Sequence, residues 1–343
     1  MTEAEKYKVL AQLSKTLDKK NDTTNSLVFL GDKVGRRLPS ISTGLPTLDY
    51  GVIGTGGLPK GRIMEVYGPE SSGKTSFALH VIGQCQKAGG ICAMIDAEHA
   101  LDVSWAALLG VNVDKLLVSQ PDNGEQALDI VDNLVESEVV DFIVVDSVSA
   151  LTPAAELAGE IGDAHMGLQA RLMSQALRIL TGKCHKKGCA ILFVNQIRES
   201  IGVTYGSNEV TSGGRALKFF SSLRLDVRRK EEIKEGTTLI GHIIKVKAKK
   251  NKCGVPFKEC FLELYYDTGF DKEGSLISYG DSIGTFSKAG SWFKLDGVNV
   301  ANGLPAFKEL LKNDPKEFAK VKAAVEKKIE EGYEGTLENN SRI

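Results

Sequence analysis

The chain of 343 residues has a formal net charge of -1, 42% hydrophobic residues and 25% charged residues, which is typical of a globular protein with a sizeable core. Such a balanced charge gives no overall attraction to polyanions, so nucleic-acid binding would depend on local basic patches. No apolar run approaches the ~20 residues of a membrane helix, and the N-terminus lacks the apolar core of a signal peptide. The six cysteines form no C-x-x-C pair, so we expect a cytoplasmic protein with reduced thiols and no membrane partner.

Residues 1–35 are expected to form a separate N-terminal segment that serves oligomerisation. Leu10, Leu13 and Leu17 lie among charged residues and predict a short amphipathic helix, which a polar linker over 19–26 follows. A single short helix cannot bury its own apolar side. It must dock either on its own core or on a neighbouring subunit, and the sequence leaves both possibilities open.

An octamer that follows a predicted strand over 63–67 fits the phosphate-binding pattern G-x-x-x-x-G-K-[ST]. It consists of Gly68, Pro69, Glu70, Ser71, Ser72, Gly73, Lys74 and Thr75. A helix is predicted directly after it, over 76–86, so that backbone N–H groups and the helix N-terminus would converge on phosphate oxygens. Lys74 is expected to reach the β- and γ-phosphates of a nucleotide, and Thr75 to hold Mg²⁺.

Beyond this loop, continuous apolar strands alternate with helices. The strands are predicted over 91–95, 116–119, 142–145 and 190–194, and the helices over 102–109, 124–137 and 168–183. This alternation is typical of an α/β fold with a mostly parallel sheet that is covered on both faces. We assign it to a core domain over 36–271, whose ligands should bind at the carboxyl ends of the strands.

Polar residues follow the ends of these strands. Asp146 closes a buried strand, where a carboxylate can orient Mg²⁺ through water. Glu98 is our candidate for positioning or deprotonating the attacking water, with Asp96 as the alternative. Gln196 ends another strand, and its amide could sense a γ-phosphate at the root of the long loop over 197–213. Each residue could instead be an ordinary polar strand end.

The helix over 168–183 carries a polar stripe that could bind a nucleic-acid backbone. Its members lie at i, i+3, i+4 and i+7: Arg171, Ser174, Gln175 and Arg178. Alone, such a stripe is typical of a solvated helix face. Next to two glycine-containing loops, over 156–167 and 197–213, it becomes a candidate groove for nucleic acid. Trp105 could either stack on a base or pack in the core.

The later part of the chain changes character. Segments 222–229, 240–249 and 259–266 alternate apolar and polar residues, as half-exposed antiparallel strands do. Lys250 and Lys252 follow Ile244, Val246 and Ala248 at every second position, so in a continuous strand they would share the same inward face. Either the strand has ended, or the lysines meet a neighbour's nucleotide phosphates. A small α+β domain is expected over 272–330, followed by a disordered tail over 331–343.

Taken together, these motifs resemble the bacterial RecA recombinases, with this chain as a diverged or phage-encoded member. The resemblance is carried by segments 40–44, 57–62, 68–75, 95–102, 119–127, 144–147, 159–163, 165–167, 195–198, 213–219 and 250–252. The most specific are Glu98-His-Ala-Leu-Asp102 and Asn195-Gln-Ile-Arg198. The resemblance implies an ATP- and Mg²⁺-dependent helical filament that coats single-stranded DNA, searches double-stranded DNA for homology and exchanges strands in recombinational repair. Its implied partners also include a repressor of the SOS response and a single-strand-binding protein.

The resemblance also implies roles for individual residues. Glu98 is similar to the residue that activates water, Gln196 to the γ-phosphate sensor, and Lys250 and Lys252 to the pair that reaches the adjacent subunit's ATP. The nucleotide would contact residues 68–75 with Ser76, Asp102, Trp105 and Asp146. The implied DNA-contacting positions are Met166, Arg171, Ser174, Arg178, Arg198, Ile201, Tyr205, Gly213, Gly214 and Arg215. Phe219 is similar to a residue of the subunit interface.

The chain departs from the family pattern at several positions. The family usually has Tyr at Trp105, a basic residue at Ser200, Phe at Tyr205 and Asn at Arg215. The linker lacks the usual Phe-Gly-Lys-Gly, and the tail is short and only mildly acidic. Two other functions fit the same motifs: a DNA-coating signalling filament without efficient strand exchange, and a helicase built on the same core.

Overall fold

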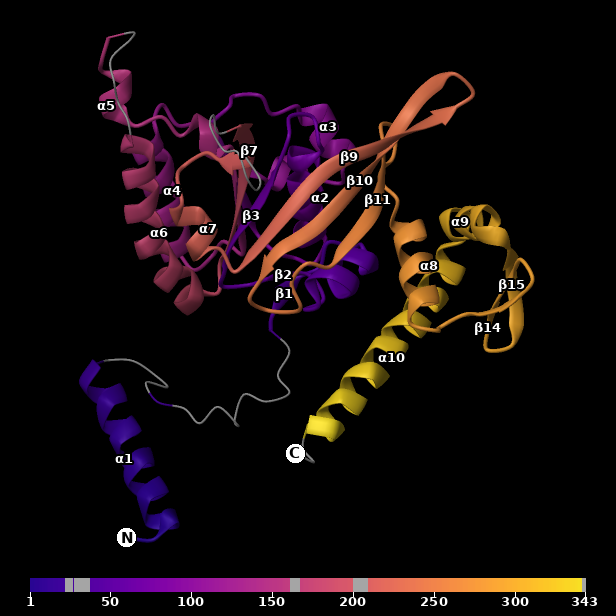
Figure 1. The fold of residues 1–343 in the computed structure, drawn as a ribbon, viewed down its shortest axis with the longest axis horizontal. Helices are drawn as coiled ribbons and strands as arrows, with labels where there is room; N and C mark the ends of the chain where they lie inside the picture. The colour runs from indigo at the N-terminus through magenta and orange to yellow at the C-terminus, as the bar shows by residue number, and fades with distance from the viewer. Residues whose placement is uncertain (22–26, 28–37, 161–166, 200–208, 341–343) are drawn as a thin grey trace. The chain divides into compact units, whose positions relative to one another are not determined.

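The computed structural model describes residues 1–21, 27, 38–160, 167–199 and 209–340. Its centre is a mixed sheet with the strand order β12-β11-β10-β9-β3-β7-β6-β4-β5, in which β8 pairs with β7 (Figure 1). The strands are β3 (Ile63–Gly68), β4 (Cys92–Asp96), β5 (Leu117–Ser119), β6 (Phe142–Asp146), β7 (Ala190–Glu199), β8 (Glu209–Thr211), β9 (Leu223–Glu235), β10 (Thr238–Asn251), β11 (Glu259–Tyr265) and β12 (Gly269–Phe270). A separate pair joins β1 (Ser40–Ile41) to β2 (Leu58–Pro59).

The pairs from β9 to β5 are parallel, and those from β9 to β12 are antiparallel. The predicted α/β class with a mostly parallel sheet is therefore confirmed. One strand differs from the prediction, because β9 is parallel to β3 and antiparallel to β10. Its first five residues, which include Leu223 and Leu225, are buried, whereas the rest of the strand is mostly exposed to solvent.

Both faces of the parallel sheet are apolar and covered by helices. These are α2 (Lys74–Lys87), α3 (Val103–Leu108), α4 (Gly124–Glu136), α5 (Ala154–Leu157), α6 (Leu168–Lys187) and α7 (Ala216–Phe220). Neighbouring strand residues point to opposite faces. Met64 accordingly joins the core that α2 covers, and Ile63 joins the core that α4 and α6 cover. The continuous apolar runs in the sequence follow from this burial on both sides.

The parallel register brings the functional strand ends together. Gly68 at the end of β3 pairs with Gln196, and Asp96 at the end of β4 pairs with Asp146. The phosphate-binding loop and the predicted polar residues therefore share the carboxyl edge of the sheet, where ligands of such folds bind.

The C-terminal part has its own core. It contains α8 (Lys272–Ser282), β13 (Ser287–Ala289), β14 (Trp292–Leu295), β15 (Val298–Asn302), α9 (Gly303–Asn313) and α10 (Pro315–Asn340). Phe307 is fully buried, and its ring centroid lies 5.3 Å from those of Phe286 and Phe293. These edge-to-face and tilted contacts stabilise the small domain together with buried aliphatic side chains such as Leu276 and Val325.

Helix α10 continues to Asn340, past the boundary predicted at 330 and into the tail predicted to be disordered. The reason is a contact distant in sequence. Tyr333 packs on the C-terminal core, and its hydroxyl donates a hydrogen bond to the Gly54 carbonyl oxygen at 2.7 Å. Such tertiary contacts override the low helix propensity of Gly332.

The N-terminal residues form α1 (Glu3–Asn21), as predicted, and Leu10 and Leu13 on it are exposed. The linker predicted over 19–26 begins later than expected, because residues 19–21 belong to α1, and residues 22–26 lie outside the described residues. All six cysteines are free, in agreement with the reduced thiols expected from the sequence. Within the described ranges, no helix has the length and apolar character required to cross a membrane.

Candidate ATP site and nucleic-acid interface

The loop over 68–75 is shaped to hold phosphate. Gly73 has φ 91°, a left-handed value that favours glycine. A Cβ on Gly68 would lie 2.0 Å from the Val227 carbonyl oxygen, so a larger residue cannot fit. Burial lowers the pKa of Lys74, whose Nζ donates to the Pro69 carbonyl oxygen at 2.6 Å. The buried hydroxyl of Ser72 has no hydrogen-bond partner among the described residues. A nucleotide phosphate would supply the missing partner, so the loop fits ATP.

Thr75 and Asp146 form the site expected for a divalent cation. The Thr75 hydroxyl donates to Oδ2 of Asp146 at 2.6 Å. Burial, together with the charge of Glu98, raises the pKa of Asp146 to about 6. A cation would favour the ionised carboxylate, and oxygen ligands beside phosphates are those that Mg²⁺ prefers. The oxygens of this pair therefore fit Mg²⁺.

The predicted water-activating and sensing residues are in direct contact. Gln196 Nε2 donates to Oε1 of Glu98 at 3.0 Å. The Ser147 hydroxyl donates to the same oxygen. Ser147 was not predicted as a partner of Glu98, although its position directly after Asp146 places it at the same strand end. These two side chains hold the Glu98 carboxylate at the sheet edge, where it can orient a water molecule.

Asp96, the alternative to Glu98, has a different role. Its carboxylate is 2% exposed and accepts from the backbone N–H groups of Ala100 and Leu101, and from Gln120 Nε2 at 2.9 Å. These bonds fix the turn that carries Glu98. A carboxylate with its lone pairs occupied in this way is a poor general base, so the structure does not support Asp96 in that role.

Asp102 and Trp105 belong to the start of α3. Oδ1 of Asp102 accepts from the N–H groups of Ser104 and Trp105 at 2.8 and 3.0 Å, which caps the helix. The indole of Trp105 donates to the Ser76 hydroxyl at 3.1 Å and is half-buried against the core. Of the two interpretations of Trp105, core packing is therefore confirmed, whereas stacking on a base stays a prediction.

The predicted DNA-contacting residues fall into two groups. Met166, Ile201 and Tyr205 lie outside the described residues, as does Ser200. The others are Arg171, Ser174 and Arg178 on α6, Arg198 on β7, and Gly213, Gly214 and Arg215 before α7. All four arginines among them are exposed. The predicted loop over 197–213 is partly regular, since β7 continues to Glu199 and pairs with β8.

The end of this second loop packs against the start of α6. The N–H of Gly213 donates to Gln169 Oε1 at 3.2 Å. A Cβ on Gly214 would lie 2.7 Å from that of Ala170. These contacts bring Arg215 and Arg171 to the same region of the surface, as expected for a groove that binds the DNA backbone.

The prediction that Lys250 shares the inward face of Ala248 is wrong. A register shift lies between Ala248 and Lys250, so that Ala248 pairs with Leu225 on the core side while Lys250 pairs with Arg224 on the opposite face. This β-bulge reverses the direction of the side chains that follow it. Nζ of Lys250 donates to the carbonyl oxygens of Lys218 and Phe219, each at 2.8 Å. Lys252, just past the strand, approaches the Phe219 carbonyl oxygen at 3.5 Å.

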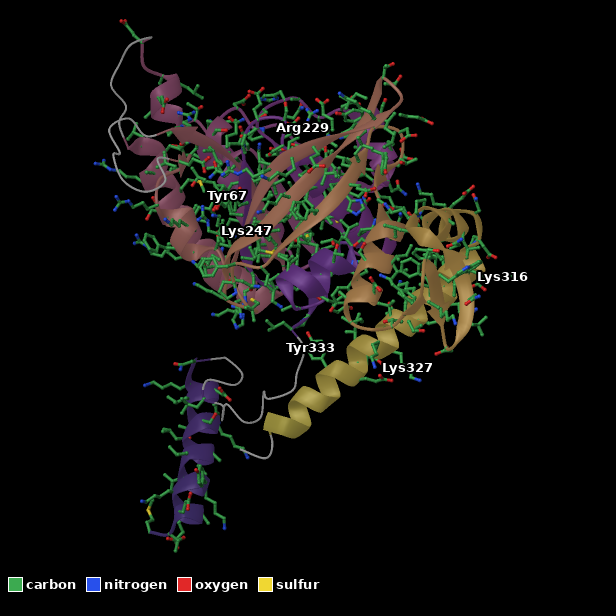
Figure 2. The ribbon with its side chains drawn as sticks, turned by 45° about the vertical axis from the view of Figure 1, so that its right-hand side comes forward. Tyr67, Arg229, Lys247, Lys316, Lys327 and Tyr333 are labelled. Atoms are coloured by element: carbon green, nitrogen blue, oxygen red, sulfur yellow. The ribbon has the colours of Figure 1, made fainter. Side chains whose placement is uncertain are left out.

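A basic hollow of about 430 Å³ on β9 and β10 was not foreseen. It is lined by Asp226, Arg228, Arg229, Lys230, Lys245, Lys247 and Lys249. Figure 2 labels Arg229 and Lys247 on these two strands. Glu259 pairs with Lys245 and Lys247 at 2.7 and 2.9 Å, so part of the charge is balanced. Lysines at every second position of a strand were the sequence signal for this surface.

The strand, phosphate-binding loop, helix and Thr75–Asp146 pair define a P-loop nucleotide hydrolase. Family models extend this result: one for the RecA N-terminal domain matches residues 8–271, and one for the RecA C-terminal domain matches 274–330. The chain belongs to the RecA family.

Similar curated proteins include three named Protein RecA. That of Cutibacterium acnes is 51% identical over 312 residues, covering 91% of this chain and 89% of the relative. Those of Mycobacteroides abscessus and Caulobacter vibrioides are each 52% identical, over 322 and 325 residues, covering 94% of this chain and 90% of each relative. The chain is therefore an ATP-dependent recombinase. It is a DNA-dependent ATPase that forms filaments on single-stranded DNA and couples ATP hydrolysis to strand exchange in recombination and repair.

Proposed function

We propose that this recombinase hydrolyses ATP between two subunits and that Gln196 passes the state of the nucleotide to the second DNA-binding loop. The observation that carries the proposal is the 3.0 Å hydrogen bond from Gln196 Nε2 to Glu98. It joins the residue that would orient water to the root of a loop that ends against α6. A γ-phosphate would compete for the same amide, so its arrival or loss would change what Gln196 binds.

Within one subunit, the loop over 68–75 and Ser76 hold the phosphates, and Asp102 and Trp105 lie toward the base. Thr75 would bind Mg²⁺ directly and Asp146 through water, and the ion would neutralise charge on the phosphates. Glu98 orients the attacking water and draws its proton. The hydrogen bonds of Glu98 to Gln196 and Ser147 support this assignment, because they fix the carboxylate before the substrate arrives.

The next subunit would complete the site with Lys250 and Lys252. Burial, together with the charges of Lys252 and Arg224, lowers the pKa of Lys250 to about 8. An anionic partner would relieve this cost. The adjacent Phe219 is 65% exposed, which is consistent with its predicted place at the subunit interface.

Nucleic acid would occupy two surfaces. The exposed surface that carries Arg171, Arg178 and Arg215 suits single-stranded DNA, and the basic hollow on β9 and β10 suits the phosphates of the incoming duplex. We also propose, from the family resemblance, contact with an SOS repressor and a single-strand-binding protein. The free thiols and the DNA substrates support a location in the cytoplasm.

Glu98→Gln tests the assignment of the water-activating residue. Glutamine keeps the size of the side chain and its hydrogen bonding but cannot accept a proton. We expect kcat with single-stranded DNA to fall by about 10²-fold or more, while nucleotide titration shows unchanged ATP affinity. Glu309→Gln, on the exposed side of α9, is the matched control and should hydrolyse ATP like the original chain. Equal turnover by Glu98→Gln would refute the assignment.

A further inference from the structure

A buried polar network lies below the second loop. Glu65, in the middle of β3, is 0% exposed. Its Oε1 accepts a hydrogen bond from Asn195 Nδ2 at 2.9 Å, and its Oε2 accepts from Nε of Arg224. The three residues lie on three neighbouring strands, since β3 pairs with β7 on one side and β9 on the other. A carboxylate in this position carries a large desolvation cost that apolar residues of the same size would not.

Asn195 connects this carboxylate to both ends of the second loop. Its Nδ2 also donates to the Ser212 carbonyl oxygen at 3.0 Å, and its Oδ1 accepts from the N–H of Gln196 at 2.9 Å. Asn195 itself is fully buried. Two oxygens face its amide nitrogen and one N–H faces its amide oxygen, so only one orientation of the amide satisfies all three bonds. Gln196, directly before the loop over 197–213, and Ser212, close to its end, are thereby tied to one side chain.

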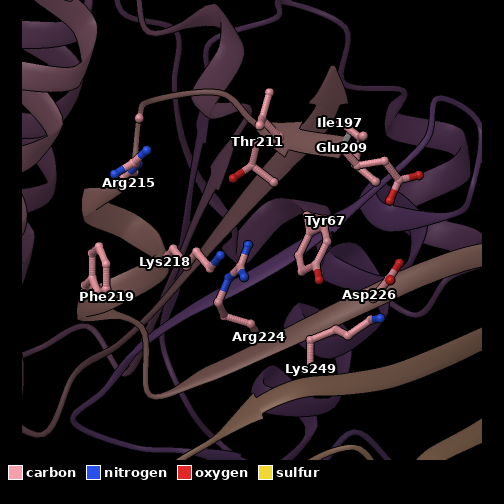
Figure 3. Close-up of a pocket in the computed structure, with 12 residues that line it drawn as sticks. Tyr67, Ile197, Glu209, Thr211, Arg215, Lys218, Phe219, Arg224, Asp226 and Lys249 are labelled. Atoms are coloured by element: carbon pink, nitrogen blue, oxygen red, sulfur yellow. The ribbon is translucent and has the colours of Figure 1, made fainter. Parts of the chain in front are cut away.

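Arg224 extends the network to β10, where Lys250 lies. Its guanidinium carbon lies 4.5 Å from the centroid of the Tyr67 ring. Both residues line a hollow of about 850 Å³, where Figure 3 shows their side chains next to each other. Lys250 is the direct partner of Arg224 in the β9–β10 pair. Glu65 is therefore linked through Asn195 to Gln196 and the loop, and through Arg224 to the strand pair that presents Lys250.

We propose that Glu65 is a positioning residue that couples ATP to DNA by holding both ends of the second loop in register with Gln196. It touches neither substrate nor reacting atoms. Its effect passes through Asn195, whose amide it orients, and through Arg224, whose charge it balances. The inference rests on the proposed sensing role of Gln196. It explains why a buried ion pair stands where an apolar pair would serve the fold equally well.

The test replaces both charges in the full-length chain, as Glu65→Leu with Arg224→Met. Apolar residues of similar size should keep the fold, and we expect a melting temperature and nucleotide affinity close to the original values. ATP hydrolysis without DNA should also be unchanged, whereas its stimulation by single-stranded DNA should fall by about tenfold or more. Trypsin should cleave after Arg198 faster in the variant without nucleotide, which reports on the loop ends independently of activity.

Two further variants keep the test decisive. Glu65→Gln keeps an acceptor for Asn195 but leaves the buried Arg224 without its counter-charge, so we expect a lower melting temperature and, in the folded protein, an intermediate loss of stimulation. Lys60→Met is the matched control. The ion pair of Lys60 with Asp141, at 2.8 Å, lies just before the first residues of β3 and β6, at the end of these strands that is far from the second loop. It should leave DNA stimulation and trypsin cleavage unchanged. Normal stimulation in a folded Glu65 variant, or equal loss in Lys60→Met, would overturn the inference.

Gln196→Ala separates this inference from the proposal on which it rests. If Gln196→Ala loses stimulation and adding Glu65→Gln causes no further loss, the two residues act in one chain of contacts. If Gln196→Ala loses stimulation but the Glu65 variants do not, the inference alone fails. If Gln196→Ala is stimulated normally, the sensing role fails and the inference fails with it.

Discussion

At the scale of single residues, we expect Lys250 to make ATP hydrolysis sensitive to alkaline pH. Its pKa is lowered to about 8 from 10.5, so the ammonium is charged below that pH and loses its proton above it. Nearby phosphates would shift the transition upward. We expect DNA-dependent ATPase activity to decline as pH rises past about 8, with kcat measured from pH 6 to 10.

Lys250→Arg provides the comparison for this prediction. A guanidinium remains charged throughout the range, so the alkaline decline should move to higher pH even if the maximum rate is lower. Identical profiles for the two proteins would exclude Lys250 as the titrating group. Lys288→Arg, on β13 of the C-terminal domain, is the control and should leave the profile unchanged.

The sequence predicted residues better than it predicted the contacts between them. Asp146, Glu98 and Gln196 could be found because polar side chains after apolar strands are visible in a one-dimensional pattern. Glu65 was hidden inside an apolar strand, and its partners Asn195 and Arg224 lie far away in the sequence. Only the strand order brings them together, and no local pattern encodes that order.

At the scale of elements, the second loop depends on Gly213, whose φ of 78° favours glycine. A Cβ there would lie 2.7 Å from Cγ1 of Val148 and 3.3 Å from Cγ of Met173 on α6. Gly213→Ala should therefore cost about 1–2 kcal/mol in backbone strain and also push the loop end away from α6. We expect weaker binding of single-stranded DNA, measured by fluorescence anisotropy.

Gly290→Ala separates the two effects. Gly290 has φ 60°, and a Cβ added to it would meet no atom within 4 Å, so this substitution carries the strain without the contact. It should lower stability by a similar amount and leave DNA affinity unchanged. If both variants bind DNA equally, the packing of the loop end on α6 has no part in binding.

Elements also show where sequence patterns lose their predictive value. The alternating segment 222–229 predicted an antiparallel strand, and β9 does pair antiparallel with β10 along its length, but its first residues, Leu223 to Asp226, also pair parallel with β3. The end of α10 looked polar and free, yet Tyr333 anchors it through one hydrogen bond to Gly54. In both cases a neighbour distant in sequence decides the outcome, as tertiary contacts commonly do.

At the scale of the whole molecule, assembly and nucleotide binding should be separable. Residues 38–335 form a compact unit by themselves, whereas Leu10 and Leu13 of α1 are 43% and 46% exposed. Removing residues 1–37 should therefore leave a folded chain that binds ATP with normal affinity but forms few filaments on single-stranded DNA. Sedimentation and nucleotide titration would measure the two properties. Long filaments of the truncated chain would contradict the assembly role of α1.

The β-bulge between Ala248 and Lys250 has a consequence for how this family can evolve. An insertion or deletion of one residue at a strand end is usually a mild event, because the chain there is near solvent. Here it would return Lys250 to the side of Leu225 and carry an ammonium group into the core. Selection should therefore act on the number of residues at this point as strictly as on their identity, and homologous chains should align across it without gaps.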